Sequence, residues 1–266
     1  MTGIISLSYL DLALASVLLL LNAGLSLRLQ LGLEKDIVVS AVRMAVQLIL
    51  VGLILKTLFS LSNPWLTLLA MLIMGAFAGR EIMARQRTRF TGWWRIGLGS
   101  TTMMIAGMLV IVLALTTQVQ PDPWYDPRYA IPLFGMILGN TMTGVSLGLN
   151  TLTTNAVNSR KAVEAALLLG CTRWVAFRPV TREALVSGMM PIINQMAAAG
   201  VVSLPGMMTG QILAGVDPTE AVKYQLLIMF LIAGSTGAGV FMSVIGGVWR
   251  LTDERHRLRL DRLQRS

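Results

Sequence analysis

The sequence predicts an all-α membrane protein: a polytopic bundle of about seven transmembrane helices that carries a pair of short helices at the cytoplasmic membrane surface. Three observations lead to this fold class. The 266 residues are 55% hydrophobic and only 13% charged, whereas a soluble domain carries about 25% charged residues. The apolar residues gather in segments of about 20, the length with which a helix crosses a bilayer. Basic residues cluster in a few of the intervening loops, as they do on the cytoplasmic side of membrane proteins.

The apolar segments define the domain organisation. No polar stretch is long enough for a sizeable soluble domain, so we expect residues 1–266 to form a single transmembrane domain. Because the first basic residue is Arg28, we expect the first apolar segment to be a retained span rather than a cleaved signal peptide. The expected spans are residues 8–29, 37–59, 64–84, 97–117, 129–151, 184–204 and 222–249.

Loop charge predicts the orientation. Three arginine-rich regions, residues 80–95, 158–182 and the tail 250–266, fall on one side of a seven-span chain together with the short loop 28–36. The other side holds residues 61–63, the acidic turn at 121–127 and the loop around Asp217-Pro218. The positive-inside rule then places the N-terminus outside and the tail in the cytoplasm, in a cell inner (plasma) membrane. This distribution explains the net charge of +9 better than nucleic-acid binding does.

The basic segment 158–182 contains the most informative motif. An Ala/Leu-rich run over 162–169 favours a helix that Gly170 ends with a positive φ, and Thr172 predicts the start of a second short helix with Phe177 and Val180 on its apolar side. The motif resembles the EAA loop of ABC-transporter membrane subunits, the coupling helix that docks onto a separate ATPase subunit. The resemblance implies coupling roles for Glu164, Ala165, Ala166, Leu167 and Gly170.

The first of these short helices has an apolar stripe at i, i+3, i+4 and i+7 spacing, a pattern typical of a helix anchored in a groove. The stripe consists of Val163, Ala166, Leu167 and Gly170, and we expect it to face the partner. An amphipathic helix resting on lipid headgroups is the alternative.

Polar side chains within spans are costly in lipid and are therefore candidates for function. Arg43 and Gln47 lie one helical turn apart in the second span, Asn140 lies in the fifth and Asn194 in the sixth. They are expected to converge on a polar translocation path. The alternative is that Arg43 reaches the interface and that the amides bond across helices.

A helix break follows the sixth span at Pro205-Gly206, flanked by Ser203, Met207 and Met208. Non-helical backbone at membrane depth is found where it lines a cavity or is buried in protein. Ser203 therefore joins the predicted path, and Met207 and Met208 are candidate ligands for a soft metal. With 17 methionines in the chain, hydrophobic packing is the alternative role for both.

Glycine pairs at four-residue spacing allow close helix contacts: Gly75 with Gly79, Gly135 with Gly139, and Gly144 with Gly148. Packing within the chain is favoured over a subunit interface for these pairs.

The sequence lacks the motifs of several enzyme classes. It contains no P-loop, no HExxH and no Gly-x-Ser-x-Gly, and its only histidine and cysteine are His256 and Cys171. A transport subunit is therefore favoured over an enzyme. No cofactor is expected in this chain, and ATP and Mg²⁺ are expected in a partner subunit.

Three longer stretches of the chain carry a second resemblance. They are Leu33-Glu34-Lys35-Asp36 leading to Arg43 and Gln47; Ile131-Pro132-Leu133-Phe134-Gly135-Met136 leading to Gly139-Asn140; and Ser203 to Gly210 leading to Ala214-Gly215-Val216-Asp217-Pro218 and Lys223-Tyr224-Gln225. These stretches resemble the FetB-type iron-export permease family. The resemblance implies a homodimeric permease that exports iron or another metal, is linked to oxidative-stress resistance and is powered by a cytoplasmic ATPase. Plant relatives imply aluminium tolerance and a nucleotide sugar as another substrate.

Two alternatives stay open. Import is the other direction, because the EAA loop is similar to that of importers. A secondary transporter without an ATPase is the other class, although segment 158–182 and the lack of paired carboxylates at membrane depth disfavour it.

Overall fold

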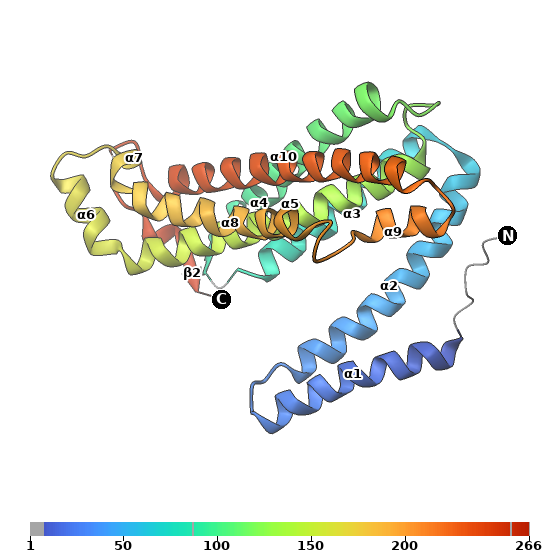
Figure 1. Ribbon diagram of the computed structural model, residues 1–266. Helices are drawn as coiled ribbons and strands as arrows, with labels where there is room; N and C mark the ends of the chain where they lie inside the picture. The colour runs from blue at the N-terminus through green and yellow to red at the C-terminus, as the bar shows by residue number, and fades with distance from the viewer. Residues whose placement is uncertain (1–7, 87, 256, 266) are drawn as a thin grey trace. The chain divides into compact units, whose positions relative to one another are not determined.

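The computed structural model describes residues 8–86, 88–255 and 257–265, and within them it is almost entirely helical (Figure 1). This confirms the all-α polytopic fold class. A π-helical stretch, Ala114–Val119, extends α4, and a short 3-10 turn, Leu260–Arg262, precedes β2. The elements are α1 Tyr9–Arg28, α2 Glu34–Leu61, α3 Pro64–Ala84, β1 Thr88–Phe90, α4 Trp94–Leu113, α5 Pro127–Asn158, α6 Arg160–Leu168, α7 Arg173–Ala176, α8 Arg178–Ala198, α9 Gly206–Leu213, α10 Pro218–Leu251 and β2 Leu263–Arg265.

The chain divides into two compact units. The first, here called the hairpin, contains α1 and α2 up to Ser62, together with Leu213–Gly215. The second, here called the bundle, contains residues 63–212 and 216–266.

In the hairpin, local hydrogen bonds define both ends of α1. Ser8 and Asp11 form a capping box, in which the Asp11 amide donates to Ser8 Oγ and the Ser8 amide to Asp11 Oδ2. At the turn into α2, Ser26 Oγ accepts from the Leu33 amide at 3.0 Å and donates to Glu34 Oε2 at 3.1 Å. Gly32 takes a φ of +71° there, a conformation that suits glycine.

Within the described residues, six helices are long and apolar enough to cross a membrane: α1, α2, α3, α4 with its π-helical extension, α5 and α10. The seventh expected span, residues 184–204, corresponds to α8, which carries Arg178, Arg182 and Glu183 in its first turns and is less apolar. Because α8 runs alongside α10 from α7 to α9, it covers a similar depth of the bundle (Figure 1). The count of seven spans therefore stays a prediction.

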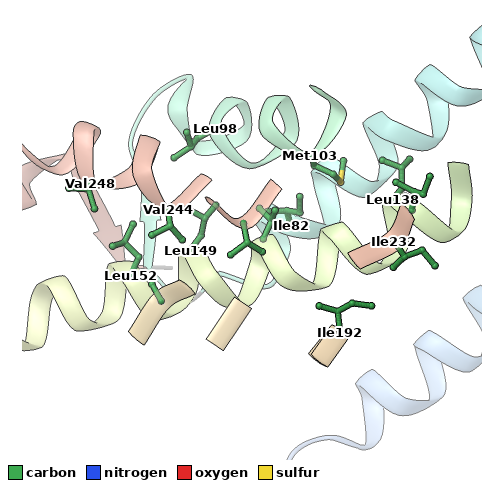
Figure 2. Packing of buried hydrophobic residues seen from close by; sticks show 14 of the residues in the cluster. Ile82, Leu98, Met103, Leu138, Leu149, Leu152, Ile192, Ile232, Val244 and Val248 are labelled. Carbon is green, nitrogen blue, oxygen red and sulfur yellow. The ribbon is translucent and has the colours of Figure 1, made fainter. Parts of the chain in front are cut away.

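Helix α5 lies at the centre of the bundle, packed against α3, α4, α8 and α10. Figure 2 shows the core that these helices share, from Val248 and Leu152 at one end to Leu138, Ile192 and Ile232 at the other. The backbones of α5 and α8 approach each other closely. A Cβ built on Gly144 would lie 2.9 Å from the Gly188 carbonyl oxygen, and one built on Gly188 would lie 2.9 Å from that of Gly144.

Two of the three glycine pairs pack within the chain, as predicted, whereas a Cβ built on Gly139 of the third pair would meet no described atom within 4 Å. A Cβ on Gly75 would overlap the Met104 side chain, and one on Gly79 would overlap Ser100. Gly148 approaches the Ala184 carbonyl. In lipid, such small residues allow helices to gain van der Waals contact and polar contacts between backbones.

One end of the bundle gathers all three arginine-rich regions. Strand β1, from the loop after α3, pairs antiparallel with β2 from the tail. Arg173 of α7 donates to Thr252 Oγ1 at the end of α10, at 3.4 Å. The predicted grouping of these three regions is thus confirmed within the bundle. The place of the loop 28–36 on the same side and the assignment of that side to the cytoplasm stay predictions.

Candidate functional site

The arginine-rich end of the bundle holds a bent helix pair, α6 and α7, at the position of the motif. The bend is a Schellman motif: the Gly170 amide donates to the Leu167 carbonyl and the Cys171 amide to the Ala166 carbonyl, both at 3.1 Å. Gly170 has a φ of +85°, which confirms the positive φ expected there. A residue with a Cβ is disfavoured in this conformation by about 1–2 kcal/mol.

The second short helix is shorter than expected. Thr172 stands at its N-cap, as predicted, although its side chain makes no capping hydrogen bond. α7 ends at Ala176, so Phe177 follows it and Val180 belongs to α8. Both side chains are buried, Phe177 completely, and they attach the bend to the bundle.

The predicted direction of the α6 stripe is wrong. Val163 is only 2% exposed and belongs to the bundle core, and Ala166 and Leu167 pack against that core. The spacing correctly identified the apolar face, but that face covers the protein's own core. A single sequence does not distinguish these two uses of an amphipathic helix.

A different set of side chains is exposed at the bend. Leu168 and Leu169 are 88% and 85% exposed, and Trp174 and Val175 are about half exposed. We call these four residues the elbow. Clustered exposed apolar side chains on a surface rimmed by charge indicate contact with a protein or a membrane.

Glu164 lies near the elbow and forms an ion pair with Arg160 one turn earlier, with Arg160 Nε 2.9 Å from Glu164 Oε1. Both side chains are substantially exposed, so the pair contributes only about 0.3–0.5 kcal/mol. Ala165 beside it is exposed. The coupling roles of Glu164, Ala165, Ala166, Leu167 and Gly170 stay predictions.

The tail after α10 is ordered against the bundle, which the sequence analysis did not foresee. Arg262 Nη1 donates to the Arg250 carbonyl at 2.8 Å and so caps the C-terminal end of α10. The Thr91 amide donates to the Arg262 carbonyl at 2.9 Å, next to the strand pair. Leu258, Leu260 and Leu263 pack on the core, and their apolar spacing was the available signal.

Two carboxylates hold the turns of this tail. Asp253 accepts from the Arg255 and Arg257 amides and pairs with Arg257 Nε at 2.8 Å. The backbone hydrogen bond from Arg257 lowers the pKa of Asp253. The pKa of Asp261 is lowered to about 2, chiefly by its hydrogen bonds from Arg259. Both carboxylates are therefore ionised at neutral pH.

The predicted translocation residues fall in both units. Arg43 and Gln47 lie one turn apart on exposed positions of α2 in the hairpin. In the bundle, Asn140 is partly buried and its Nδ2 donates to the Met136 carbonyl of its own helix at 2.9 Å. Asn194 is exposed on α8. Their convergence on one path stays a prediction.

The helix break after α8 is confirmed. α8 ends at Ala198, and the chain is non-helical until α9 begins at Gly206. Ser203 and Met207 are exposed, and Met208 is half-buried. Within the described residues, no group of three or more His, Cys, Asp or Glu side chains could hold a metal ion. The roles of the two methionines toward a metal stay predictions.

Comparison with known proteins identifies relatives along nearly the whole chain. Residues 9–251 match the family described as "Uncharacterised protein family (UPF0014)". A UPF0014 membrane protein of Synechocystis is 43% identical over 71% of this chain and 73% of its own. The "Probable iron export permease protein FetB" of Escherichia coli is 32% identical over 96% of each chain. "Protein ALUMINUM SENSITIVE 3" of Arabidopsis thaliana is 32% identical over 84% of this chain and 80% of its own. No solved structure matches significantly.

Proposed function

This chain belongs to the UPF0014 family, and from that premise we propose that it is the membrane-spanning permease subunit of an ABC transporter that exports iron or another metal. It is a multi-pass membrane protein with relatives named as membrane proteins and one named as a permease. The proposed energy source is ATP hydrolysis, with Mg²⁺, in a separate cytoplasmic ATPase subunit. Two copies of the chain are proposed to form the transport unit in the inner membrane.

The elbow is the observation that carries the ATPase partnership. Its four apolar side chains project at a bend that the Schellman motif and the buried Phe177 hold in place. A rigid apolar tip on a surface with positive charge suits insertion into a cleft of a partner protein, since preformed anchors cost little conformational entropy on binding. Movement of that cleft during ATP hydrolysis would be transmitted to α5 and α8, which flank the bend in sequence.

Iron is proposed as cargo on the basis of one relative's name and nearly full-length similarity. The absence of a His, Cys, Asp or Glu cluster among the described residues favours weak, transient contacts along a path over a tight resident site. Weak contacts suit transport, because cargo that binds tightly leaves slowly.

Two measurements test the proposal. The tagged full-length chain should co-purify with an ATPase subunit, and cells lacking the gene should retain more iron under iron overload than cells carrying it. Transport by the purified chain in vesicles without any ATPase would instead establish a secondary transporter. Import of the same metal would reverse the proposed direction.

The proposed orientation has its own test. In a Cys171→Ser background, Asp122→Cys and Glu254→Cys each place a thiol at an exposed position. In intact cells, an impermeant thiol reagent should label the first and not the second. The opposite pattern would invert the topology. Gln86 is a poor probe position because its side chain is only 3% exposed.

A further inference from the structure

A cleft of about 380 Å³ lies at the arginine-rich end of the bundle, beside the elbow and separate from it. Its walls come from the start of α4, from α7, from the end of α10 and from the ordered tail. Trp94 and Trp249 provide the aromatic part of the lining, and Arg173 and Arg250 provide part of its charge. The proposed ATPase coupling does not use this cleft.

The lining carries more positive charge than its own acids neutralise. Arg173, Arg250, Arg255, Arg257 and Arg262 face two acids, Asp253 and Glu254. Asp253 is already engaged by Arg257 and by backbone amides. Arg262 Nη1 already donates a hydrogen bond to the Arg250 carbonyl at the end of α10. An excess of cationic N–H donors therefore remains in a cleft that is open on one side.

Arg250 is the most informative of these residues. Its guanidinium lies 5.2 Å from the centre of the Trp94 ring, which orients it by a cation–π contact. Its Nε is buried and has no hydrogen-bond partner among the described residues. A buried guanidinium N–H without an acceptor costs free energy, so such a group in a native protein calls for a ligand or water.

The position of the cleft identifies the kind of ligand. Helices α10 and α4 are both long and apolar enough to cross a membrane, and the cleft lies where α10 ends at Leu251 and α4 begins at Trp94. We infer from this position that the cleft lies at the level of the membrane–water interface. Trp249 beside it is 59% exposed, as expected for an interfacial aromatic residue. Phosphate is the anion of that layer, and planar guanidinium groups bind phosphate oxygens in pairs.

We propose that this cleft binds the phosphate of an anionic phospholipid headgroup. The phosphate oxygens accept from Arg250 Nε and from the Arg173 guanidinium, while the acyl chains lie against the membrane-facing surface beside Trp94 and Trp249. Because Arg173 belongs to α7 and Arg250 to α10, the bound phosphate ties the bent helix pair to the end of the longest span. A soluble phosphate compound is the other source of the same chemistry.

The test uses the purified, delipidated full-length protein and native mass spectrometry to count bound lipid. Phosphatidylglycerol should bind more tightly than phosphatidylcholine. In Arg173→Gln/Arg250→Gln, its dissociation constant should rise about tenfold or more, as expected for the loss of charge-assisted hydrogen bonds. Arg95→Gln is the matched control, because Arg95 is an exposed arginine next to Trp94 that does not line the cleft. It should change the constant by less than about twofold.

A competition experiment with inorganic phosphate distinguishes a lipid headgroup from a soluble phosphate compound as the ligand. Displacement of phosphatidylglycerol by millimolar inorganic phosphate would assign the site to a soluble phosphate and overturn the lipid assignment.

A second variant covers the case in which the double variant does not elute as a single helical species. Arg255→Gln, at an exposed position in the cleft lining, then replaces it, and the dissociation constant for phosphatidylglycerol should again rise. Equal retention of phosphatidylglycerol by wild type and variants would overturn the site. A variant that keeps the lipid but loses the ATPase would show a protein-docking surface instead.

Discussion

The hairpin and the bundle use apolar residues in opposite ways. α2 is the most apolar of the six candidate spans, yet none of its residues is buried within the described structure. α5 is the least apolar of the six, yet 16 of its 32 residues are buried. Lipid tails are as apolar as the side chains of Leu or Val, so burying such side chains between helices in a membrane gives no hydrophobic stabilisation. Small and hydroxylated residues, by contrast, allow van der Waals contacts and hydrogen bonds between helices. A high content of apolar residues therefore indicates a membrane-spanning helix here, whereas small residues indicate where that helix packs against others.

The same contrast separates two kinds of polar side chain. In the bundle, Thr141 and Ser235 form a buried hydrogen bond between α5 and α10 at 3.1 Å. In the hairpin, Arg43 and Gln47 lie at exposed positions in a helix with no buried residues. The first pair joins two helices of the bundle, whereas the second lies on a face of α2 that is not buried. Arg43 and Gln47 are thus the residues of the predicted path that lie in the hairpin.

The largest effect is expected from a glycine in the bundle. Gly188→Leu forces a side chain against the Gly144 carbonyl and Val240, and we expect a loss of about 3 kcal/mol in stability and of most protein in the membrane. A Cβ built on Gly52 in the hairpin would meet no atom within 4 Å, so Gly52→Leu should change stability by less than about 1 kcal/mol. Melting in detergent measures both. An equal loss at Gly52 would show that the hairpin surface is packed in the native membrane.

The next effect distinguishes the two faces of α6. Val163→Asp places a carboxylate in the core and should lower stability by several kcal/mol, on the order of 3. Leu168→Asp alters only the exposed elbow, so the protein should accumulate normally but co-purify poorly with its ATPase. Membrane abundance and pull-down yield together give the answer. Normal co-purification of Leu168→Asp would remove the elbow from the docking surface.

Substitutions at the bend should have intermediate effects. Gly170→Val strains the left-handed backbone by about 1–2 kcal/mol, whereas Gly170→Asn is better tolerated. Glu164→Lys also removes the pair with Arg160, so Arg160→Gln is its control. We expect coupled ATP hydrolysis to fall in Gly170→Val and Glu164→Lys and to persist in the two controls. Full transport by Glu164→Lys would contradict the coupling role of Glu164.

In the hairpin, Arg43→Gln should reduce transport while changing stability by less than about 1 kcal/mol, because Arg43 lies at an exposed position of α2. We expect metal efflux to fall about tenfold, the size of one lost charged contact. Lys56→Gln is the control, a basic residue elsewhere on the same helix. Metal content of overloaded cells gives the readout. Similar efflux in both variants would remove Arg43 from the path.

The smallest effect is expected at the helix break. Replacing Met207 and Met208 with Leu keeps volume and apolarity, so folding should persist while metal efflux falls by a factor of about three, if the thioethers contact the cargo. Met71→Leu in the bundle core is the control and should leave efflux unchanged. Unchanged resistance in the double variant, at normal abundance, would assign both methionines to packing.

The sequence by itself determined the fold class, the approximate limits of the long helices and the bend at Gly170. These properties follow from local physics: an apolar run of sufficient length crosses a membrane, and a glycine after an Ala/Leu-rich run ends a helix. The grouping of the arginine-rich regions also followed, since loop charge reports the side of the membrane.

Only the tertiary structure decided which face of each helix is used. Val163 faces inward and Leu168 outward because Phe177 and Val180, which follow the bend, are buried in the core and fix the orientation of α6. These residues lie in different helices or loops. The cleft around Arg250 combines Trp94, Arg173 and Arg262, which are distant in sequence. Spacing along one helix defines an apolar face, but the partner of that face depends on contacts that only the folded chain creates.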